Sequence, residues 1–278
     1  YYGNVPPGSG TEPSWRTFDH RPRFNNNYAG LRNRIGILSE AYAYATFEER
    51  VNTSRRFIEE LLRIAHDQTA EIRSLVARLD RESVVGTRLA TRGEAQRSPT
   101  ATEILLGATE ELQHPYTRAP IRRRLDVAES TTMFEYGRFS ASEEETAPAT
   151  YFVPERLAPI LELLAAHGVE GTVLEADVTL TGERFAITRS TLADRQTEEH
   201  RERTIEGSWA PAEFLLPAGT VAIPVAQPLG RLAFTLLEPR SDDGFVNWNL
   251  LDDEIQPGGS FPIVRVMSEP ERRTGQPQ

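Results

Sequence analysis

The sequence lacks cysteine and lysine, two residue types on which many enzymes depend. Without cysteine the chain has no thiol nucleophile, no disulfide and no thiolate ligand for zinc. All 31 basic residues are arginine, so the chain has no amine for a Schiff base and no lysine for a phosphate-binding loop. Absence of cysteine is compatible with both reducing and oxidising compartments. The compartment therefore stays open, with an exported (periplasmic or secreted) location slightly favoured.

The chain also has little positive charge and no long apolar run. Acidic residues outnumber basic ones by 41 to 31, and the net charge of −10 argues against a nucleic-acid partner. No apolar run approaches the roughly 18 residues that a transmembrane helix needs, so we expect no membrane span. The opening Tyr1-Tyr2-Gly3 has no initiator methionine and no signal sequence, which is typical of a fragment or a processed product.

The first 33 residues are rich in glycine, proline and asparagine, but they also contain aromatic residues that argue against disorder. Arg21, Arg23, Arg32 and Arg34 lie close together in this stretch. One interpretation is that these guanidinium groups pair with carboxylates and stack on aromatic rings. The other is that one of them, with Arg23 as the candidate, binds a carboxylate of the substrate, for which the planar arginine fork is suited.

A possible catalytic carboxylate follows in the segment Arg34–Arg50, R-I-G-I-L-S-E-A-Y-A-Y-A-T-F-E-E-R. The apolar run Ile35–Leu38 predicts a short buried strand, and Glu40 stands at its end. A carboxylate in that place is costly to desolvate unless it has a partner or a chemical task, such as that of a general base. Alternatively, Glu40 caps the first turn of the next helix or pairs with a nearby arginine.

The block from Phe18 to Arg50, F-D-H-R-P-R-F-N-N-N-Y-A-G-L-R-N-R-I-G-I-L-S-E-A-Y-A-Y-A-T-F-E-E-R, resembles the end of the catalytic domain in bacterial zinc carboxypeptidases. These enzymes belong to the carboxypeptidase A-like metallopeptidase family, in a long-chain subgroup with a C-terminal extension. The resemblance continues more loosely through residues 217–228 and 236–252. In that family a glutamate at a strand end, just before the last helix, is the general base, and Glu40 matches it. Tyr28 is a weaker candidate for the family's substrate-clamping hydroxyl.

The resemblance implies an α/β fold in which residues 1–80 are the C-terminal part of a mixed-sheet catalytic domain. Residues 81–149 would be a linking segment, and residues 150–278 a β-rich α+β accessory domain. The implied activity is zinc-dependent hydrolysis at the C-terminus of a peptide or protein, with Glu40 as base and Tyr28 and Arg23 binding the substrate. The alternative is that the chain is a binding or accessory module without catalytic activity. A glycosidase would need a second carboxylate, and none stands out.

A His-x-x-Glu pair opens the zinc site in that family, and only His167-Gly168-Val169-Glu170, at the end of an expected helix, has that spacing in this chain. The histidines are scattered singly, so we expect structural or surface roles for them and zinc ligands upstream of residue 1. This chain alone is therefore expected to be inactive. The histidines are His20, His66, His114, His167 and His200.

Apolar periodicity predicts the remaining elements. A long amphipathic helix is expected over residues 47–79, broken near His66, and a second helix over residues 154–167, ended by Gly168. We expect surface or linker roles for Glu143–Glu145 and for the aspartates near residues 242 and 252. The expected strands are residues 150–153, 172–181, 184–189, 203–205, 220–225 and 232–237, with a turn at Thr181-Gly182.

Overall fold

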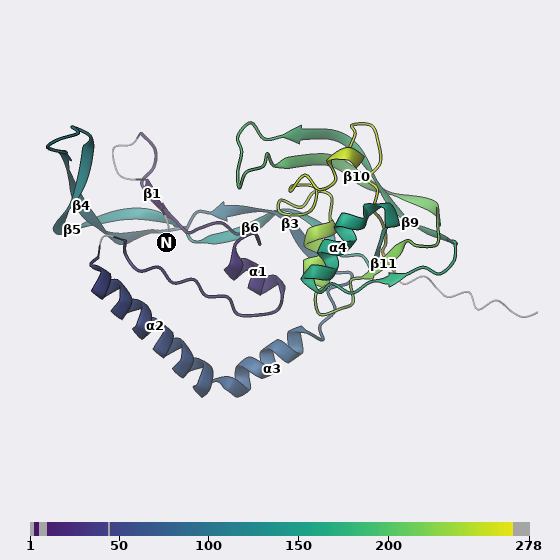
Figure 1. Ribbon diagram of the computed structural model, residues 1–278, viewed down its shortest axis with the longest axis horizontal. Coiled ribbons are helices and arrows are strands. Elements are labelled where there is room, and N and C mark those ends of the chain that lie inside the picture. The colour runs from purple at the N-terminus through teal and green to yellow at the C-terminus, as the bar shows by residue number, and fades with distance from the viewer. Residues whose placement is uncertain (1–2, 6–9, 44, 269–278) are drawn as a thin grey trace, which may run out of the picture. The chain divides into compact units, whose positions relative to one another are not determined.

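The computed structural model describes residues 3–5, 10–43 and 45–268. In this part of the chain the fold is mixed α/β, with five α-helices and three sheets (Figure 1). None of the described helices is both long and apolar enough to cross a bilayer. The expected α/β class is thus confirmed at this coarse level.

The chain divides into two compact units, each of which is built from two separate stretches of sequence. The first unit contains Tyr1–His20 and Gly93–Ala141, and the second contains Arg21–Arg92 and Ser142–Gln278. The chain leaves and re-enters the second unit along two paired strands, β3 (Arg88–Gln96) and β6 (Arg138–Thr146). The three-part division expected from the sequence stays a prediction, because packing units and related sequence segments need not coincide.

The first unit holds a four-stranded sheet. Its strands, in spatial order, are β1 (Gly3–Val5), β2 (Ser14–Arg16), β5 (Pro120–Tyr136) and β4 (Ala101–Gln113). β4 and β5 form a long antiparallel pair, whereas β2 runs parallel to β5. The linking segment expected at residues 81–149 therefore contains two of the longest strands, and its charged residues lie mostly on exposed positions of them.

The second unit is organised around a six-stranded antiparallel sheet. The spatial order of its strands is β10 (Arg203–Leu216), β9 (Val178–Leu192), β12 (Val264–Val266), β7 (Thr150–Val153), β11 (Val221–Pro224) and β8 (Thr172–Val173). The turn predicted at Thr181-Gly182 is wrong, because both residues lie inside β9. A Cβ on Gly182 would come within 2.5 Å of the Arg265 carbonyl oxygen, so glycine serves the close approach of two strands.

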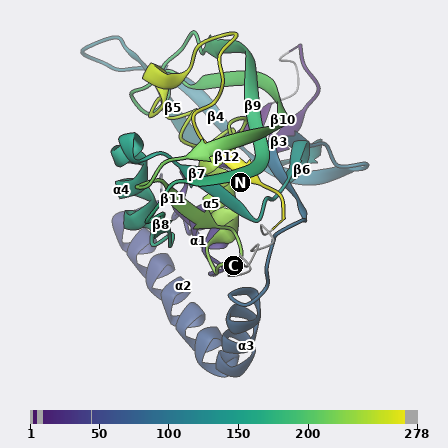
Figure 2. The ribbon, with the colours of Figure 1, turned by 90° about the vertical axis from the view of Figure 1, so that its right-hand side faces the viewer.

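Alternating residues of β7 divide the core into two layers. Tyr151 and Val153 point to the main cluster, which also contains buried side chains of helices α4 (Ala158–His167) and α5 (Gly230–Leu237). Phe152 belongs to a smaller cluster with Phe214 and the valines of β12. Figure 2 shows α4 and α5 beside β7 and β11. Helices thus cover one face of this sheet, and a thin apolar layer the other.

Of the two helices in this core, one was predicted from the sequence and the other was predicted to be a strand. The predicted helix over residues 154–167 is confirmed as a 3-10 turn at Glu155–Leu157 followed by α4, and Gly168 ends it with a φ of 82°. The strand predicted over residues 232–237 is wrong, since these residues form most of α5. A short apolar run fits a buried strand and a buried helix equally well, and periodicity does not separate them.

Residues 34–80 form a helical excursion that contains no strand among the described residues. The predicted strand at Ile35–Leu38 is wrong, because these residues are irregular and pair with no described strand. Helices α2 (Phe47–Asp67) and α3 (Thr69–Leu79) follow, and the break between them lies at Gln68, close to the predicted position. Neither helix contains a buried residue. A further short helix, α1 (Asn25–Leu31), precedes this excursion.

Candidate functional site

A pocket of about 370 Å³ in the second unit contains two of the predicted site residues, Arg23 and Tyr28. Arg23 lies in the turn before α1, and Tyr28 lies in α1 itself. The opposite walls come from α4, α5 and the turn-rich segment after α5. The apolar lining consists of Leu163, Leu232, Leu236, Phe245, Trp248 and Leu250. Segments far apart in the sequence therefore build one concave and largely apolar site.

Arg23 is held by carboxylates at the edge of this pocket. Its Nε donates to Asp243 Oδ1 at 2.8 Å, and its Nη1 donates to Glu202 Oε1 at 2.7 Å. Its Nη2 donates to the side-chain oxygen of Asn247 at 2.9 Å, and only 4% of the side chain is exposed. All three guanidinium nitrogens thus have protein acceptors. For Arg23 the structure therefore agrees with the first interpretation of the arginine-rich stretch, in which the guanidinium groups pair with carboxylates of the protein. These contacts leave Arg23 poorly placed to bind a substrate carboxylate.

Asp243 is the central acceptor of this edge. It is 3% exposed, and besides Arg23 it accepts a hydrogen bond of 2.8 Å from Trp248 Nε1. Trp248 in turn lies under the Arg23 guanidinium, 4.8 Å from the ring centroid, and stacks on His200 at 4.3 Å. The surface-turn role expected for Asp243 is therefore wrong. A buried carboxylate is stable here because a cation and two further donors satisfy it.

The other end of the pocket has a chain of hydrogen bonds through Tyr28. Its hydroxyl lies 2.7 Å from Nδ1 of His167, the last residue of α4, and accepts a bond of 3.0 Å from Arg32 Nη1. Partial burial lowers the pKa of His167, and the charge of Arg32 lowers it further. The lone histidine that the sequence suggested would only end a helix therefore lies in the pocket, as a neutral hydrogen-bonding group.

Glu40 lies outside this pocket and has a different environment. It is exposed, in the irregular segment between α1 and α2, and it is absent from the pocket lining. The structure therefore brings Tyr28 and Arg23 together but does not bring Glu40 to them. The burial that the sequence suggested for Glu40 is not found, because the apolar residues before it do not form a buried strand.

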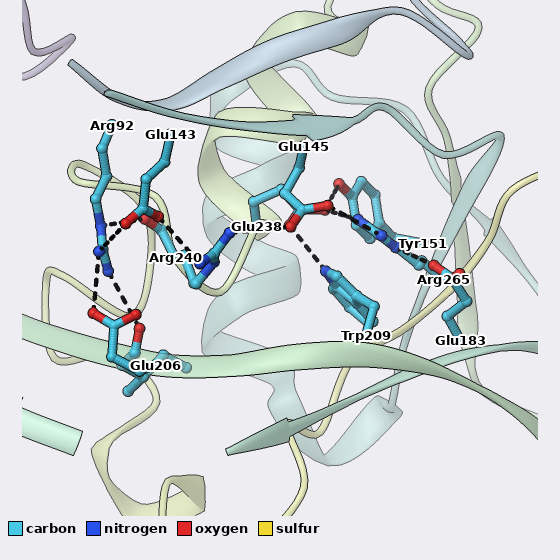
Figure 3. Close-up of polar contacts among 11 residues, drawn as sticks. Arg92, Glu143, Glu145, Tyr151, Glu183, Glu206, Trp209, Glu238, Arg240 and Arg265 are labelled. Carbon is cyan, nitrogen blue, oxygen red and sulfur yellow. Dashed lines mark hydrogen bonds and ion pairs between the residues drawn. The ribbon is translucent and has the colours of Figure 1, made fainter. Parts of the chain in front are cut away.

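A buried network fixes the α5 wall of the pocket to the sheet (Figure 3). Glu238, directly after α5, is 1% exposed and accepts bonds from Tyr151 Oη at 2.6 Å, Arg265 Nη1 at 2.9 Å and Trp209 Nε1 at 3.3 Å. Burial raises the pKa of Glu238, and Arg265 and Tyr151 oppose this shift. Burial also raises the pKa of Tyr151 well above its ordinary value.

Arg265 is the cation that makes this network possible. Its side chain is 4% exposed, pairs also with Glu183 at 2.8 Å and Glu145 at 3.4 Å, and lies 4.1 Å from the Trp209 ring centroid. Shifted pKa values often mark catalytic groups, but structural ion-pair networks shift them as well. Since all of these donors and acceptors belong to the protein, we assign the network a structural role.

A second group of ion pairs extends this network (Figure 3). Arg92 of β3 pairs with Glu143 at 2.7 Å and Glu206 at 3.1 Å. Arg240 pairs with Glu143 at 3.3 Å and Glu145 at 3.2 Å. The expectation that Glu143–Glu145 form a solvated linker is wrong, because these residues belong to β6 and two of them are only partly exposed.

A zinc site does not fit the residues that the structure describes. In the part of the chain that the structure describes, no group of three or more histidine, aspartate or glutamate side chains is arranged to hold a metal ion. The histidines lie apart, in the first unit (His20 and His114), in α2 (His66), in the pocket (His167) and on Trp248 (His200).

Sequence reasoning missed His167, Asp243, Trp248, Glu238 and Arg265. A signal exists for the last of these, since Arg265 interrupts the apolar run Ile263–Val266, and a charge within a buried strand requires a partner. His167 and Asp243 lack such a local signal, because Tyr28, which bonds His167, and Arg23, which pairs with Asp243, lie more than 130 positions away.

Comparison with known proteins found no match. No family model, curated protein or solved structure matched this chain.

Proposed function

We propose that this chain supplies the general-base segment of a zinc carboxypeptidase that hydrolyses peptide bonds at a C-terminus. In this proposal residues 1–80 are the end of the catalytic domain, residues 81–149 link it onward, and residues 150–278 are an accessory domain. Glu40 accepts a proton from the attacking water and passes it to the leaving amine. The zinc ligands belong to polypeptide outside these 278 residues, since the described residues do not fit a zinc site. The resemblance of residues 18–50 to that family supports this assignment.

The observation that carries the proposal is the exposed apolar surface on both sides of Glu40. Before it, the exposed fractions are 57% for Ile35, 55% for Ile37 and 46% for Leu38. After it, they are 54% for Tyr42 and 81% for Phe47. Contiguous apolar side chains at a surface mark an interaction site. A partner that covers them would also take Glu40 out of contact with bulk solvent.

This exposed surface continues along the first turns of α2. A groove of about 530 Å³ is lined there by apolar side chains together with Arg50, Arg55 and Glu59. The apolar lining residues are Ala41, Phe47, Val51 and Ile58. The helix after the proposed base thus has the apolar face that a catalytic-domain helix would pack against its sheet.

Tyr28 and Arg23 are weaker parts of the proposal. Tyr28 would clamp substrate only if its hydroxyl exchanged His167 and Arg32 for the substrate, and Arg23 would have to leave Asp243 and Glu202. Both residues stay predictions as substrate-binding groups.

The decisive test is Glu40→Gln in a protein that carries this chain together with zinc ligands. The near-isosteric amide removes the proton acceptor, so kcat/KM for release of C-terminal amino acids should fall about 100- to 10,000-fold. Melting temperature and zinc content should stay unchanged. Glu48→Gln is the matched control, because Glu48 is also exposed and lies eight positions further along the chain. A Glu40→Gln protein that keeps most of its activity would refute the role of Glu40.

The second candidate is a binding or accessory module without catalysis. The pocket between α1, α4 and α5 favours it, because the cavity is already formed and its walls are fixed by buried ion pairs.

A further inference from the structure

Arg32 contacts two residues that line the pocket, Tyr28 and His167, and no carboxylate of the described residues balances its positive charge. Its Nη1 donates to the Tyr28 hydroxyl and to the His167 carbonyl oxygen, which are both uncharged acceptors. Arg32 is only partly exposed, and within the described residues it forms no ion pair. Arg23, at the other end of the pocket, is balanced by Asp243 and Glu202. A partly buried guanidinium group without a counter-ion favours an anion nearby.

His167 offers a hydrogen-bond donor beside this charge. Arg32 donates to the Tyr28 hydroxyl, so that hydroxyl is free to donate its own proton to His167 Nδ1. A neutral imidazole that accepts at Nδ1 carries its proton on Nε2. Burial and Arg32 lower the pKa of His167 and so favour this neutral form. Among the described residues Nε2 has no hydrogen-bond partner, which leaves one N–H group available at the pocket wall.

The rest of the pocket is suited to an apolar body. Six of the lining residues are leucine, phenylalanine or tryptophan, and the volume of about 370 Å³ lies within the range of small-molecule sites. Asp243 does not repel an anion strongly, because Arg23 neutralises it. The pocket therefore combines an apolar chamber with one donor on His167, and the Arg32 charge lies directly beside that end, bonded to two of the lining residues.

We propose that this pocket binds an apolar group that carries a carboxylate. The apolar body packs against Leu232, Leu236 and Phe245, and the carboxylate accepts a hydrogen bond from His167 Nε2 in the field of Arg32. This site goes beyond the proposed peptide hydrolysis, since it uses neither Glu40 nor a metal ion. Glu40→Gln leaves this binding unchanged, so the two proposals fail separately.

The test compares octanoate with octanamide, which has the same carbon chain and no charge, by isothermal titration calorimetry on the chain. Octanoate is expected to bind about 10- to 100-fold more tightly, the usual gain from a charge-assisted contact. Arg32→Gln should abolish this preference, whereas Arg34→Gln, a nearby exposed arginine paired with Asp80, should keep it. Equal binding of octanoate and octanamide, or no saturable octanoate binding, would overturn the proposal.

A second pair of variants locates the binding without disturbing the hydrogen bonds of Tyr28. Leu163 is 36% exposed and lines the pocket, so Leu163→Trp should fill the pocket while the chain still folds. Glu162→Trp, at the neighbouring exposed position of α4, is the matched control. Loss of octanoate binding in Leu163→Trp alone supports the site, and unchanged binding in that variant overturns it.

The carboxylate could come from a free organic acid or from the C-terminus of a peptide. N-acetyl-Ala-Leu and its C-terminal amide, titrated in the same way, distinguish these sources. Binding of the peptide acid but not its amide supports the site and assigns the carboxylate to a peptide terminus. Binding of octanoate without binding of the peptide acid supports it as a site for free acids.

Discussion

Two pairs of helices in this chain have opposite surroundings. α2 and α3 are amphipathic and contain no buried residue, whereas α4 buries Ile160 and Leu164, and α5 buries most of its length. Apolar residues on α2, such as Ile58 and Leu62, are 55% and 66% exposed. Periodicity therefore shows which face of a helix is apolar, but it does not show whether anything covers that face.

The two pairs are also stabilised differently. α2 relies on local interactions, namely a capping box between Thr46 and Glu49 and ion pairs such as Arg55 with Glu59. Such interactions contribute only tenths of a kcal/mol to about 1 kcal/mol each. α5 instead ends at Glu238, whose buried contacts with Tyr151 and Arg265 reach the central sheet. Most helical stability comes from tertiary packing, so α2 and α3 should be the less stable pair.

The largest expected effect comes from Arg265→Met, which removes the cation of the buried network. Glu238 and Glu183 would lose their partner, and breaking one side of a buried ion pair costs about 3 to 5 kcal/mol. Arg63→Met is the control, because Arg63 is 61% exposed on α2 and its pairs are solvated. Urea unfolding at pH 7 measures both. Equal stability of Arg265→Met and the wild type would contradict the contrast between buried and exposed pairs.

A slightly smaller effect is expected for the apolar residues of the two helix pairs. Leu237→Ala in α5 creates a cavity at a residue that is 1% exposed and should cost about 2 to 5 kcal/mol. Leu62→Ala in α2 removes a side chain that is 66% exposed and should change the unfolding free energy by less than about 0.5 kcal/mol. Similar losses in both variants would show that α2 is covered in solution, for example by a second copy of the chain.

The same contrast explains how much of the fold was predictable. Local signals were sufficient for α4, where Gly168 supplies the left-handed residue that ends the helix, and for the break between α2 and α3. They failed at Ile35–Leu38 and at residues 232–237, because a short apolar run is compatible with a strand, a helix or an exposed segment. Only contacts across the chain decide among these.

The candidate site was predictable only in part. Arg23 was a candidate because of its arginine-rich stretch, and Tyr28 because of the family resemblance, yet their partners Asp243 and His167 lie 220 and 139 positions away. Pairing over such distances is a property of the fold and leaves no pattern in the neighbouring sequence. For Glu40 the sequence indicated a role but not its present exposed environment.

The smallest expected effect concerns the junction between residues 33–34 and residues 79–80, the two ends of the segment that contains α2 and α3. Arg34 Nη1 donates to Asp80 Oδ1 at 2.9 Å, and Asn33 contacts Asp80 and the Leu79 carbonyl oxygen at 3.3 Å. Asp80→Asn should cost less than about 1 kcal/mol, because Arg34 is 51% exposed and the pair is screened by solvent. Hydrogen exchange of the backbone amides around residues 79–82 would detect such a local loss.

The stability of this junction should also depend on pH, and the pKa of Asp80 determines the direction. The hydrogen bond from Arg34, together with that from Asn33, holds the pKa of Asp80 below its ordinary value. A carboxylate with a lowered pKa in the folded state contributes stability above its unfolded pKa, and this contribution is lost as the pH falls through the lower folded value. Protection of the junction should therefore decrease below about pH 4 in the wild type. Asp80→Asn should remove this acid-dependent step, whereas Asp67→Asn, at a 54% exposed position of α2, should keep it. An identical acid response in the wild type and Asp80→Asn would show that the Arg34–Asp80 pair does not hold the junction closed.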